Sequence, residues 1–480
     1  EDSTFLTPLS FSAANELDLR VYGSYASTLS FPAVAEIESL SLTSSTLETL
    51  ELPEAAVAGP VGVASVIGLQ TLSLPTLFSA SRLNVDGMPD LETLSAPKLE
   101  AVAGNLIIDD APVLTTLALD SLEQVGPTGE NSLGIGDLKI NKVHALTSLS
   151  LPQLQSVGSW FRVWDAALLA HVDLGSLQEV GWSFNLEELP SLAQLDAGEL
   201  ATVWRDLGIY ETTVGTLEFS QLSQVRELTF EDNTALTTLS CGALGGVTSI
   251  NVRENPALTE VSLAALETVD DTLFIEDNLS LSAVSLDSLI SVAEKLFVED
   301  NPALVSLELS NLQTVGTNLR LVDNGWMPEC EVDALVAQLT EFEGLPQSVT
   351  LTGQRVACTC DDETKIDEEG NIFQEMVPVC FASHQVLNLM GYDIILEATD
   401  LDGNPAQLDV LLIGDYLEYT MMEVQGIGDL RPSGFLSTFE IYGPTVAPEN
   451  LIYSGFSDED WILQESSDTT QEVYKLTMDQ

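Results

Sequence analysis

Leucine and valine recur along most of the chain in a fixed pattern. The clearest copies are "LFIEDNLSLSAVSLDSLISV" at residues 273–292 and "LFVEDNPALVSLELSNLQTV" at residues 296–315. Each copy opens with a short segment of alternating apolar and polar residues and continues as LxxLxLxxLxxV. Alternation at a period of two predicts β-strands with one buried face.

The valine that ends each copy gives the repeat length. Between Val102 and Val315 these valines are 22 or 23 residues apart, except for one interval of 32 residues. The longer interval contains "GPTGENSLGI" at residues 126–135, which we expect to form a surface loop. Weaker copies precede Val102, so the array spans about residues 17–321, in about thirteen turns.

One unit of this size cannot bury its own apolar face, but stacked copies can share a continuous core. The sequence therefore predicts a mainly β fold, a right-handed parallel β-solenoid with little helix. Its last turn would expose the core and an unpaired strand edge, so a cap is expected. Residues 331–342 carry apolar side chains at helical spacing and predict a capping helix.

The solenoid is expected to occupy residues 1–329 and the cap residues 330–360. Residues 361–371, "DDETKIDEEGN", have the composition of an acidic linker. The 22-residue period is lost in residues 372–480, where strand-like segments such as "YDIILEATD" are separated by turn signals such as "LDGNP". This pattern predicts a small β-sandwich-like C-terminal domain.

Four of the five cysteines lie close together in the sequence, at Cys330, Cys358, Cys360 and Cys380. Cys358 and Cys360 are too near each other to pair easily. We expect disulfides from Cys330 to Cys358 and from Cys360 to Cys380, which implies an oxidising compartment. Zinc binding is the alternative, although a CxC spacing lacks the usual CxxC pairs. Cys241 stands alone within the repeats.

An asparagine recurs at the same place in five consecutive repeats: Asn233, Asn255, Asn278, Asn301 and Asn324. A buried asparagine there would satisfy main-chain groups where the chain leaves the strand, and would pair with the next asparagine in the stack. The acidic residues before it, as in "EDN", most often form a solvated edge. Calcium is the one cofactor that they could attract, and no metal ligands are assigned.

Charge excludes several classes of partner. The formal net charge is -60, from 75 acidic and 15 basic residues, so nucleic acid and anionic membranes are unlikely partners. No apolar run reaches the roughly 18 residues that a membrane span needs. The sequence contains no GxSxG, HExxH or P-loop motif, so we expect a protein that is not an enzyme. Carbohydrate-cleaving β-helices are the enzymatic alternative.

Basic and aromatic residues gather at outward positions of the first strand in the middle repeats. Three tryptophans, Trp160, Trp182 and Trp204, directly precede that strand in successive turns. This composition is typical of a binding hot spot, so we predict a contact patch for a surface protein, a glycan or another copy of the chain. In the alternative, the aromatic rings fill bends and the cations pair with acidic neighbours. The predicted patch consists of Lys139, Asn141, Arg162, Trp164, Tyr210 and Arg253.

Threonines stacked in the second strand, such as Thr49, Thr71 and Thr93, also resemble ice-binding solenoids. Charged residues interrupt the second column that an ice-binding face needs. Stacked threonines stabilise parallel strands in any case, so the structural explanation is preferred.

The units "LTFEDNTALTTLSCGALGGV" and "LFVEDNPALVSLELSNLQTV" resemble the receptor L domain, the leucine-rich β-helix of insulin and EGF receptor ectodomains. The family has relatives among fungal cell-wall and bacterial surface proteins. The stretch "NGWMPECEVDALVAQL" is similar to its closing cap, a helix clipped by a disulfide. The resemblance covers residues 17–360, but the chain lacks the cysteine-rich modules and kinase of the receptors, so it does not imply hormone-receptor function.

What the resemblance implies is an extracellular or cell-surface protein without catalysis, used for recognition or adhesion. The alternative is a structural subunit of a surface fibre or layer, assembled with the help of calcium.

Overall fold

The computed structural model describes residues 9–10, 16–23, 27–127, 135–325, 327, 329–341, 344, 346 and 348–352, together with seven strands between residues 384 and 477. The chain forms two compact units. The first consists of Glu1–Leu321 with Leu339–Thr350, and the second of Val322–Gln338 with Leu351–Gln480.

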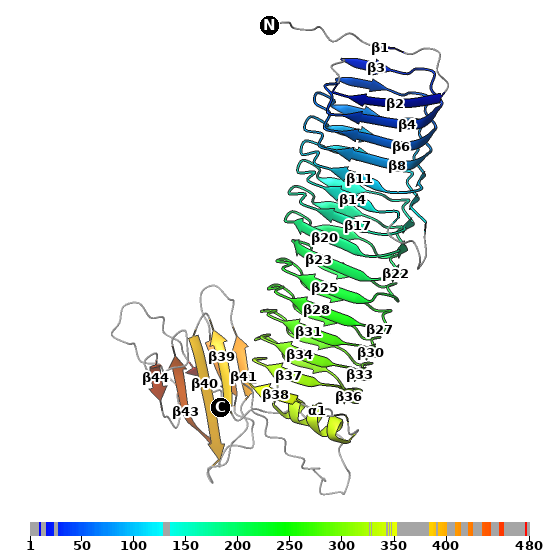
Figure 1. Ribbon diagram of the computed structural model, residues 1–480. Coiled ribbons are helices and arrows are strands. Elements are labelled where there is room, and N and C mark those ends of the chain that lie inside the picture. The colour runs from blue at the N-terminus through cyan, green and yellow to red at the C-terminus, as the bar shows by residue number, and fades with distance from the viewer. Residues whose placement is uncertain are drawn as a thin grey trace, which may run out of the picture. The chain divides into compact units, whose positions relative to one another are not determined.

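The first unit is a parallel β-solenoid, which confirms the predicted mainly β architecture of stacked turns (Figure 1). Its thirteen turns lie between fourteen successive strands of one sheet. This sheet, here the long sheet, consists of β2 (Glu16–Tyr22), β4 (Glu36–Thr43), β6 (Val57–Ala64), β8 (Ser79–Asp86), β11 (Leu106–Asp109), β14 (Leu138–Asn141), β17 (Phe161–Trp164), β20 (Phe184–Leu189), β23 (Asp206–Thr212), β25 (Glu227–Glu231), β28 (Ser249–Arg253), β31 (Thr272–Glu276), β34 (Lys295–Glu299) and β37 (Asn318–Val322).

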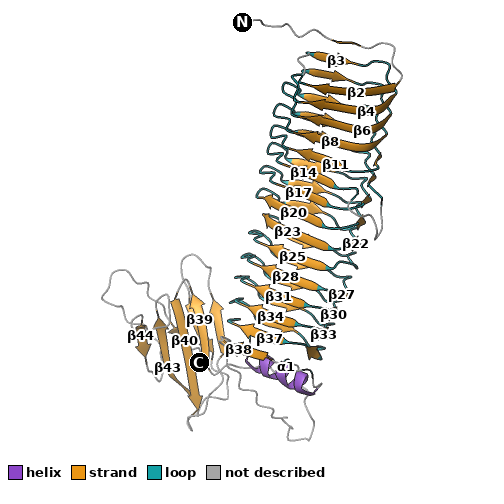
Figure 2. Cartoon of the chain, viewed as in Figure 1, coloured by secondary structure: helices purple, strands orange, loops and turns teal. Residues whose placement is uncertain are grey.

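Short strands form the other sides of the solenoid (Figure 2). A second set of parallel strands comprises β1 (Leu9–Ser10), β3 (Thr28–Ser30), β5 (Thr49–Glu51), β7 (Thr71–Ser73), β9 (Thr93–Ser95), β12 (Thr116–Ala118), β15 (Ser148–Ser150), β18 (His171–Asp173), β21 (Gln194–Asp196), β24 (Thr216–Glu218), β26 (Thr238–Ser240), β29 (Glu260–Ser262), β32 (Ala283–Ser285) and β35 (Ser306–Glu308).

Two-residue strands form the third side: β10 (Ala101–Val102), β13 (Gln124–Val125), β16 (Ser156–Val157), β19 (Glu179–Val180), β22 (Thr202–Val203), β27 (Gly246–Val247), β30 (Thr268–Val269), β33 (Ser291–Val292) and β36 (Thr314–Val315). In the first turns the strands of the long sheet extend into this third side. For example, the start of β8 pairs with β10 and its end pairs with β11.

The register stacks like residues on like residues. Leu273 pairs with Leu296 and Ile275 with Val298 on neighbouring strands, and all four side chains are at most 1% exposed. Burying one such aliphatic side chain contributes about 1.5–3 kcal/mol. Each turn therefore completes the core of the next, which explains why the repeat length is so constant.

Tight turns close each coil between the strands. In the "NPAL" turn, the Leu304 N–H donates to the Asn301 carbonyl at 3.0 Å, and Pro302 lies at the second position. A proline is favoured there because its ring fixes the backbone angle that a type I turn needs.

A left-handed backbone conformation recurs at the end of each strand of the long sheet. Glycine occupies this corner at Gly23 and Gly87, each with φ of 59°. Twelve other corners have φ between 49° and 57°: Ser44, Ser65, Asp110, Lys142, Asp165, Glu188, Glu211, Asp232, Glu254, Asp277, Asp300 and Asp323. The aspartate of "EDN" is thus the corner residue, and aspartate tolerates this conformation better than most residues.

The predicted helix near residue 331 is present as α1 (Glu329–Glu341), and its side chains at Val332, Leu335 and Leu339 are buried. Its role as a cap stays a prediction. The side chain of Cys330 lies outside the described part of the structure. The same is true of Cys358, Cys360 and Cys380 and of the acidic linker at residues 361–371. The two expected disulfides therefore also remain predictions.

The second unit contains strands from His384 onward, most of which pair antiparallel. One sheet has the order β39 (His384–Leu389), β40 (Tyr392–Asp400), β43 (Gly434–Tyr442) and β44 (Leu451–Gly455). The other joins β41 (Asp409–Ile413), β42 (Met421–Gln425) and β45 (Leu476–Thr477), and in it β42 pairs with β45 in parallel. Their arrangement as a sandwich stays a prediction.

Candidate binding face on the long sheet

The outward side chains of the long sheet form columns that run from turn to turn. One column contains Lys139, Arg162, Asn185, Gly208, Thr229 and Asn251 in adjacent strands. The next contains Asn141, Trp164, Glu187, Tyr210, Glu231 and Arg253. The fold thus brings Lys139, Asn141, Arg162 and Trp164 together on β14 and β17, whereas Tyr210 and Arg253 lie farther along the same face.

The cations of this predicted patch already have acidic partners. The Arg162 guanidinium stacks on the Trp164 ring, 4.6 Å from its centroid, and its Nη2 is 2.5 Å from the Glu187 carboxylate. Nη2 of Arg253 is 2.8 Å from the Glu231 carboxylate. These are the contacts that the alternative interpretation predicts, in which the chain's own acids neutralise the cations.

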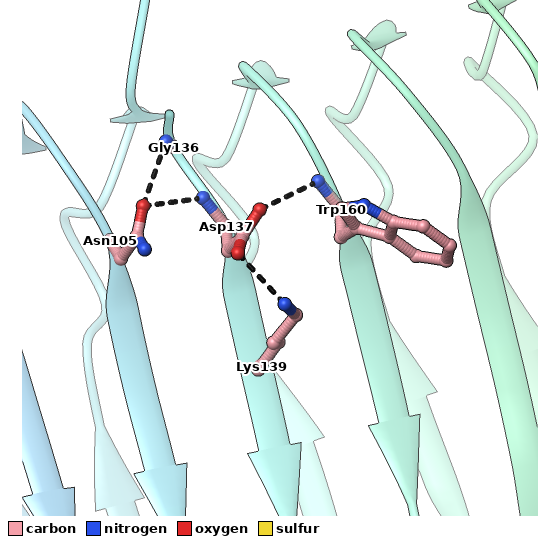
Figure 3. Close-up of polar contacts among 5 residues, drawn as sticks. All are labelled: Asn105, Gly136, Asp137, Lys139 and Trp160. Carbon is pink, nitrogen blue, oxygen red and sulfur yellow. Dashed lines mark hydrogen bonds and ion pairs between the residues drawn. The ribbon is translucent and has the colours of Figure 1, made fainter. Parts of the chain in front are cut away.

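Lys139 belongs to a polar network that joins three turns (Figure 3). The Asn105 side-chain carbonyl accepts hydrogen bonds from the N–H groups of Gly136 and Asp137, at 2.9 and 3.1 Å. The Asp137 carboxylate accepts from Lys139 Nζ at 2.8 Å and from the Trp160 N–H at 3.4 Å. This network fixes the return of the longest turn to the sheet, so these residues have a structural role.

Tyr210 lies across the sheet and covers Gly208. A Cβ atom on Gly208 would be only 2.3 Å from Cε2 of Tyr210, so the ring position requires a glycine in the neighbouring column. Desolvation, together with repulsion from nearby carboxylates such as Glu187, raises the pKa of the Tyr210 hydroxyl. The ring is thus held flat and neutral on the face.

The three tryptophans that precede the strands also have partners. The Arg205 guanidinium is 4.5 Å from the centroid of the Trp182 ring, and Nε1 of Trp204 donates to the Glu179 carboxylate at 2.9 Å. Lys139 Nζ lies 5.9 Å from the centroid of the Trp160 ring. The aromatic rings are half-buried, so the patch is a rigid surface of stacked rings and cations.

A groove on the same face, closer to the N-terminus, was missed by the sequence analysis. It has a volume of about 520 Å³ and lies over β2, β4, β6 and β8, with Asn105 and Ile107 of the next turn at its edge. Small residues at Ser41 and Gly62 lie in one column between Arg20 and Asn84. Arg82 also lines the groove. Arg20 and Arg82 are exposed, and no ion pair of either is found within the described part of the chain.

Nearly all cations of the solenoid belong to the long sheet. Residues 1–325 contain eleven lysines and arginines. Seven lie within its strands: Arg20, Arg82, Lys139, Arg162, Arg253, Lys295 and Arg320. Lys142, Arg205 and Arg226 lie one residue outside such a strand, and only Lys98 lies elsewhere. One side of a very acidic protein therefore carries most of its positive charge.

Carboxylates gather along the corner beside the long sheet. Asp165, Glu188, Glu211 and Asp232 are corner residues of successive turns and line a second groove of about 610 Å³. Within the described residues, no three His, Cys, Asp or Glu side chains are grouped so that they could hold a metal ion. Calcium binding stays an expectation. In the same part of the chain, no helix has the length and apolar character to cross a membrane.

No protein-family model matches the sequence, and no curated protein matches it either. The fold defines the class of the protein, a leucine-rich parallel β-solenoid. Its likeness to receptor L domains depends on the repeat and cap motifs alone.

Proposed function

We propose that this is an extracellular, cell-surface protein without catalysis, which recognises a surface protein or a glycan through the outer face of the long sheet and so serves in adhesion. The observation that carries the proposal is the charge distribution, because ten of the eleven cations in residues 1–325 lie on or beside that sheet. Where such a cation has no acidic partner among the described residues, as at Arg20 and Arg82, it can attract an anionic ligand and orient it.

Rigidity of the face also supports recognition. The outward side chains are held by stacking and by carboxylates, as Arg162 is by Trp164 and Glu187. A preorganised surface loses little side-chain entropy when a ligand binds. The extracellular location is supported by the clustered cysteines, the acidic surface and the resemblance to receptor L domains.

The proposal is tested by binding of the purified full chain to a glycan array and to intact cells. A face variant, Arg162→Ala with Trp164→Ala, is compared with a variant of another side, Lys98→Ala with Thr93→Ala. We expect ligand binding by the wild type, with a larger loss in the face variant. Folded protein that binds neither glycans nor cells, or that loses binding only in the other-side variant, would contradict the proposal.

Assembly into a surface fibre or layer is the second candidate. It is favoured by the two exposed arginines of the long sheet, Arg20 and Arg82, which in one copy could pair with the acidic corner of another. That corner is lined by Asp165, Glu188, Glu211 and Asp232. Sedimentation of the full chain with and without calcium tests this candidate. A monomer at all concentrations in both conditions would reject it.

A further inference from the structure

We infer that the groove over β2, β4, β6 and β8 is a binding site for a short acidic saccharide, whose carboxylate is recognised by Arg20 and Arg82. The inference rests on the proposed function, because it names the ligand class for one part of the long sheet. The groove spans three strand spacings, about 14 Å, which is enough for one or two sugar rings.

The first argument is the state of the two arginines. Arg162, Arg253 and Arg320 on the same sheet each pair with a glutamate. Arg20 and Arg82 are exposed in the groove, and no carboxylate partner is found for either among the described residues. A guanidinium group binds a carboxylate through two parallel hydrogen bonds. An anionic ligand would therefore add an ion pair here, whereas at Arg162 it would have to displace one.

The second argument is the chemistry of the lining. Ser41 and Asn84 present polar side chains, and Asn105 uses its carbonyl oxygen within the solenoid, as Figure 3 shows. No hydrogen bond of Asn105 Nδ2 is found within the described residues, so this donor can serve a ligand. Tyr22, with 68% of its surface exposed, offers an aromatic face at the edge. Hydroxyl-rich rings need such a combination of polar groups and one stacking surface.

The lining favours a saccharide over a protein partner. Protein interfaces depend on large apolar or aromatic anchors that fill pockets. The aliphatic residues at the floor, Leu40 and Val61, point into the core and are 1% and 0% exposed. The accessible apolar residues of the lining, Tyr22, Pro60 and Ile107, lie on three different strands with polar residues between them, so they do not form one large anchor site. A protein would thus gain little here, whereas a sugar would find hydrogen bonds.

The surroundings limit the length of the ligand. Asp86 and Asp109 form a column beside the groove, and their mutual repulsion, after desolvation, helps to raise the pKa of Asp86. A long polyanion would run over these carboxylates and be repelled. A single acidic sugar, or an oligosaccharide with one terminal acidic residue, would place its charge at the arginines alone.

The binding test uses the full chain and two pairs of probes, sialyllactose with lactose and galacturonate with galactose. Calorimetry or interferometry measures affinity at low and physiological salt. We expect at least one acidic probe to bind about tenfold more tightly than its neutral partner, with an affinity that falls as salt rises. Equal binding of the acidic and neutral probes overturns the inference, and so does equally tight binding of a triglutamate peptide.

Two variants locate the site. Arg20→Gln with Arg82→Gln removes the charges, and its control, Lys98→Gln with Lys295→Gln, makes the same charge change elsewhere. Gly62→Val fills the groove floor, where an added Cβ would be 3.9 Å from the Leu40 carbonyl oxygen and would meet no closer atom. We expect a loss of about tenfold or more in both groove variants and of less than about twofold in the control. Thermal unfolding verifies that each variant is folded.

Different failures are distinguishable. If acidic probes bind but only the Arg162→Ala and Trp164→Ala variant loses them, the long sheet binds ligands as proposed and the groove is not the site. If neither the probes nor the array nor cells bind the folded wild type, the proposed function fails as well.

Discussion

Asn278 and Asn301 lie one above the other in adjacent turns, and both the main-chain N–H and Nδ2 of Asn278 donate to Oδ1 of Asn301, at 3.2 Å each. Nδ2 of Asn278 also donates to the Val252 and Glu276 carbonyls, at 3.0 and 2.9 Å. Asn255 donates to Asn278 in the same way. Each asparagine thus satisfies buried main-chain groups of its own turn and a neighbouring one.

We predict that Asn278→Ala lowers the free energy of unfolding by about 3 kcal/mol or more. The substitution leaves several buried donors and acceptors without partners, and each such group costs about 1–3 kcal/mol. Asn278→Asp should be at least as damaging, because a carboxylate cannot donate to the Val252 and Glu276 carbonyls. Urea denaturation measures both effects.

An exposed asparagine provides the control for the Asn278 variants. Asn311 Nδ2 donates to the Asp287 carbonyl at 2.6 Å in a solvent-exposed turn. Water can replace that hydrogen bond, so Asn311→Ala should cost less than about 1 kcal/mol. If Asn278→Ala were no more harmful than Asn311→Ala, the asparagine stack would not be a main support of the solenoid.

Periodicity made the columns of the middle repeats predictable. Because Lys139, Arg162 and Asn185 occupy the same place in successive units, their adjacency follows from the repeat length alone. The groove at Gly62 could not be found this way, since the early repeats are weaker copies and a hollow depends on the size of neighbouring side chains. Nor does sequence show which cations have partners, because that depends on rotamers across the strands.

The left-handed corner was also absent from the sequence-based expectations, although a signal exists. Aspartate is the commonest residue at this position and glycine also occurs there, and both residues are tolerated at positive φ. Taken from the sequence alone, the acidic character of "EDN" is compatible with calcium binding. The structure shows a backbone reason for the second residue of that motif, which needs no metal.

The left-handed corner predicts that the same substitution, glutamate to glycine, changes stability in opposite directions at Glu211 and Glu218. Glu211 has φ of 53°, a conformation that costs a side-chain-bearing residue about 1–2 kcal/mol relative to glycine. After allowance for the flexibility of glycine in the unfolded chain, Glu211→Gly should stabilise the protein by about 0.5–1 kcal/mol. Glu218 lies in the extended strand β24, so Glu218→Gly should destabilise by about 0.5–1 kcal/mol. Equal signs in urea denaturation would refute this explanation of the corner.

Acidic residues lie close together at the ends of β31 and β34, and we predict that their repulsion lowers stability as pH rises. Desolvation, followed by repulsion from Asp277, Glu299 and Asp300, raises the pKa of Glu276 above its ordinary value of 4.5. Because the folded state then holds its proton more tightly than the unfolded chain, the contribution of Glu276 to stability is complete below the ordinary pKa and is lost as pH rises through the raised one.

Glu276→Gln tests the contribution of that carboxylate. The variant should be more stable than the wild type at pH 7, and the difference should vanish near pH 4, where Glu276 is protonated. Added salt at pH 7 should reduce the difference in part, because it screens repulsion but not desolvation. Thermal unfolding of both proteins between pH 4 and 8 measures the effect. A wild type that is the more stable of the two at pH 7 would contradict the prediction.

Cysteine reactivity tests both the core and the expected disulfides. Cys241 is fully buried, and its desolvation raises the pKa of the thiol to about 12. Only a thiolate is alkylated, so native protein at pH 8 should not react with iodoacetamide at Cys241. In denaturant without reductant, mass spectrometry should find one alkylated cysteine, and five after reduction. Cys241→Ala should show none before reduction and four afterwards, which assigns the single free thiol. Five alkylated cysteines in unreduced, denatured wild type would instead show that Cys330, Cys358, Cys360 and Cys380 are free, and the argument for an oxidising compartment would lose its basis.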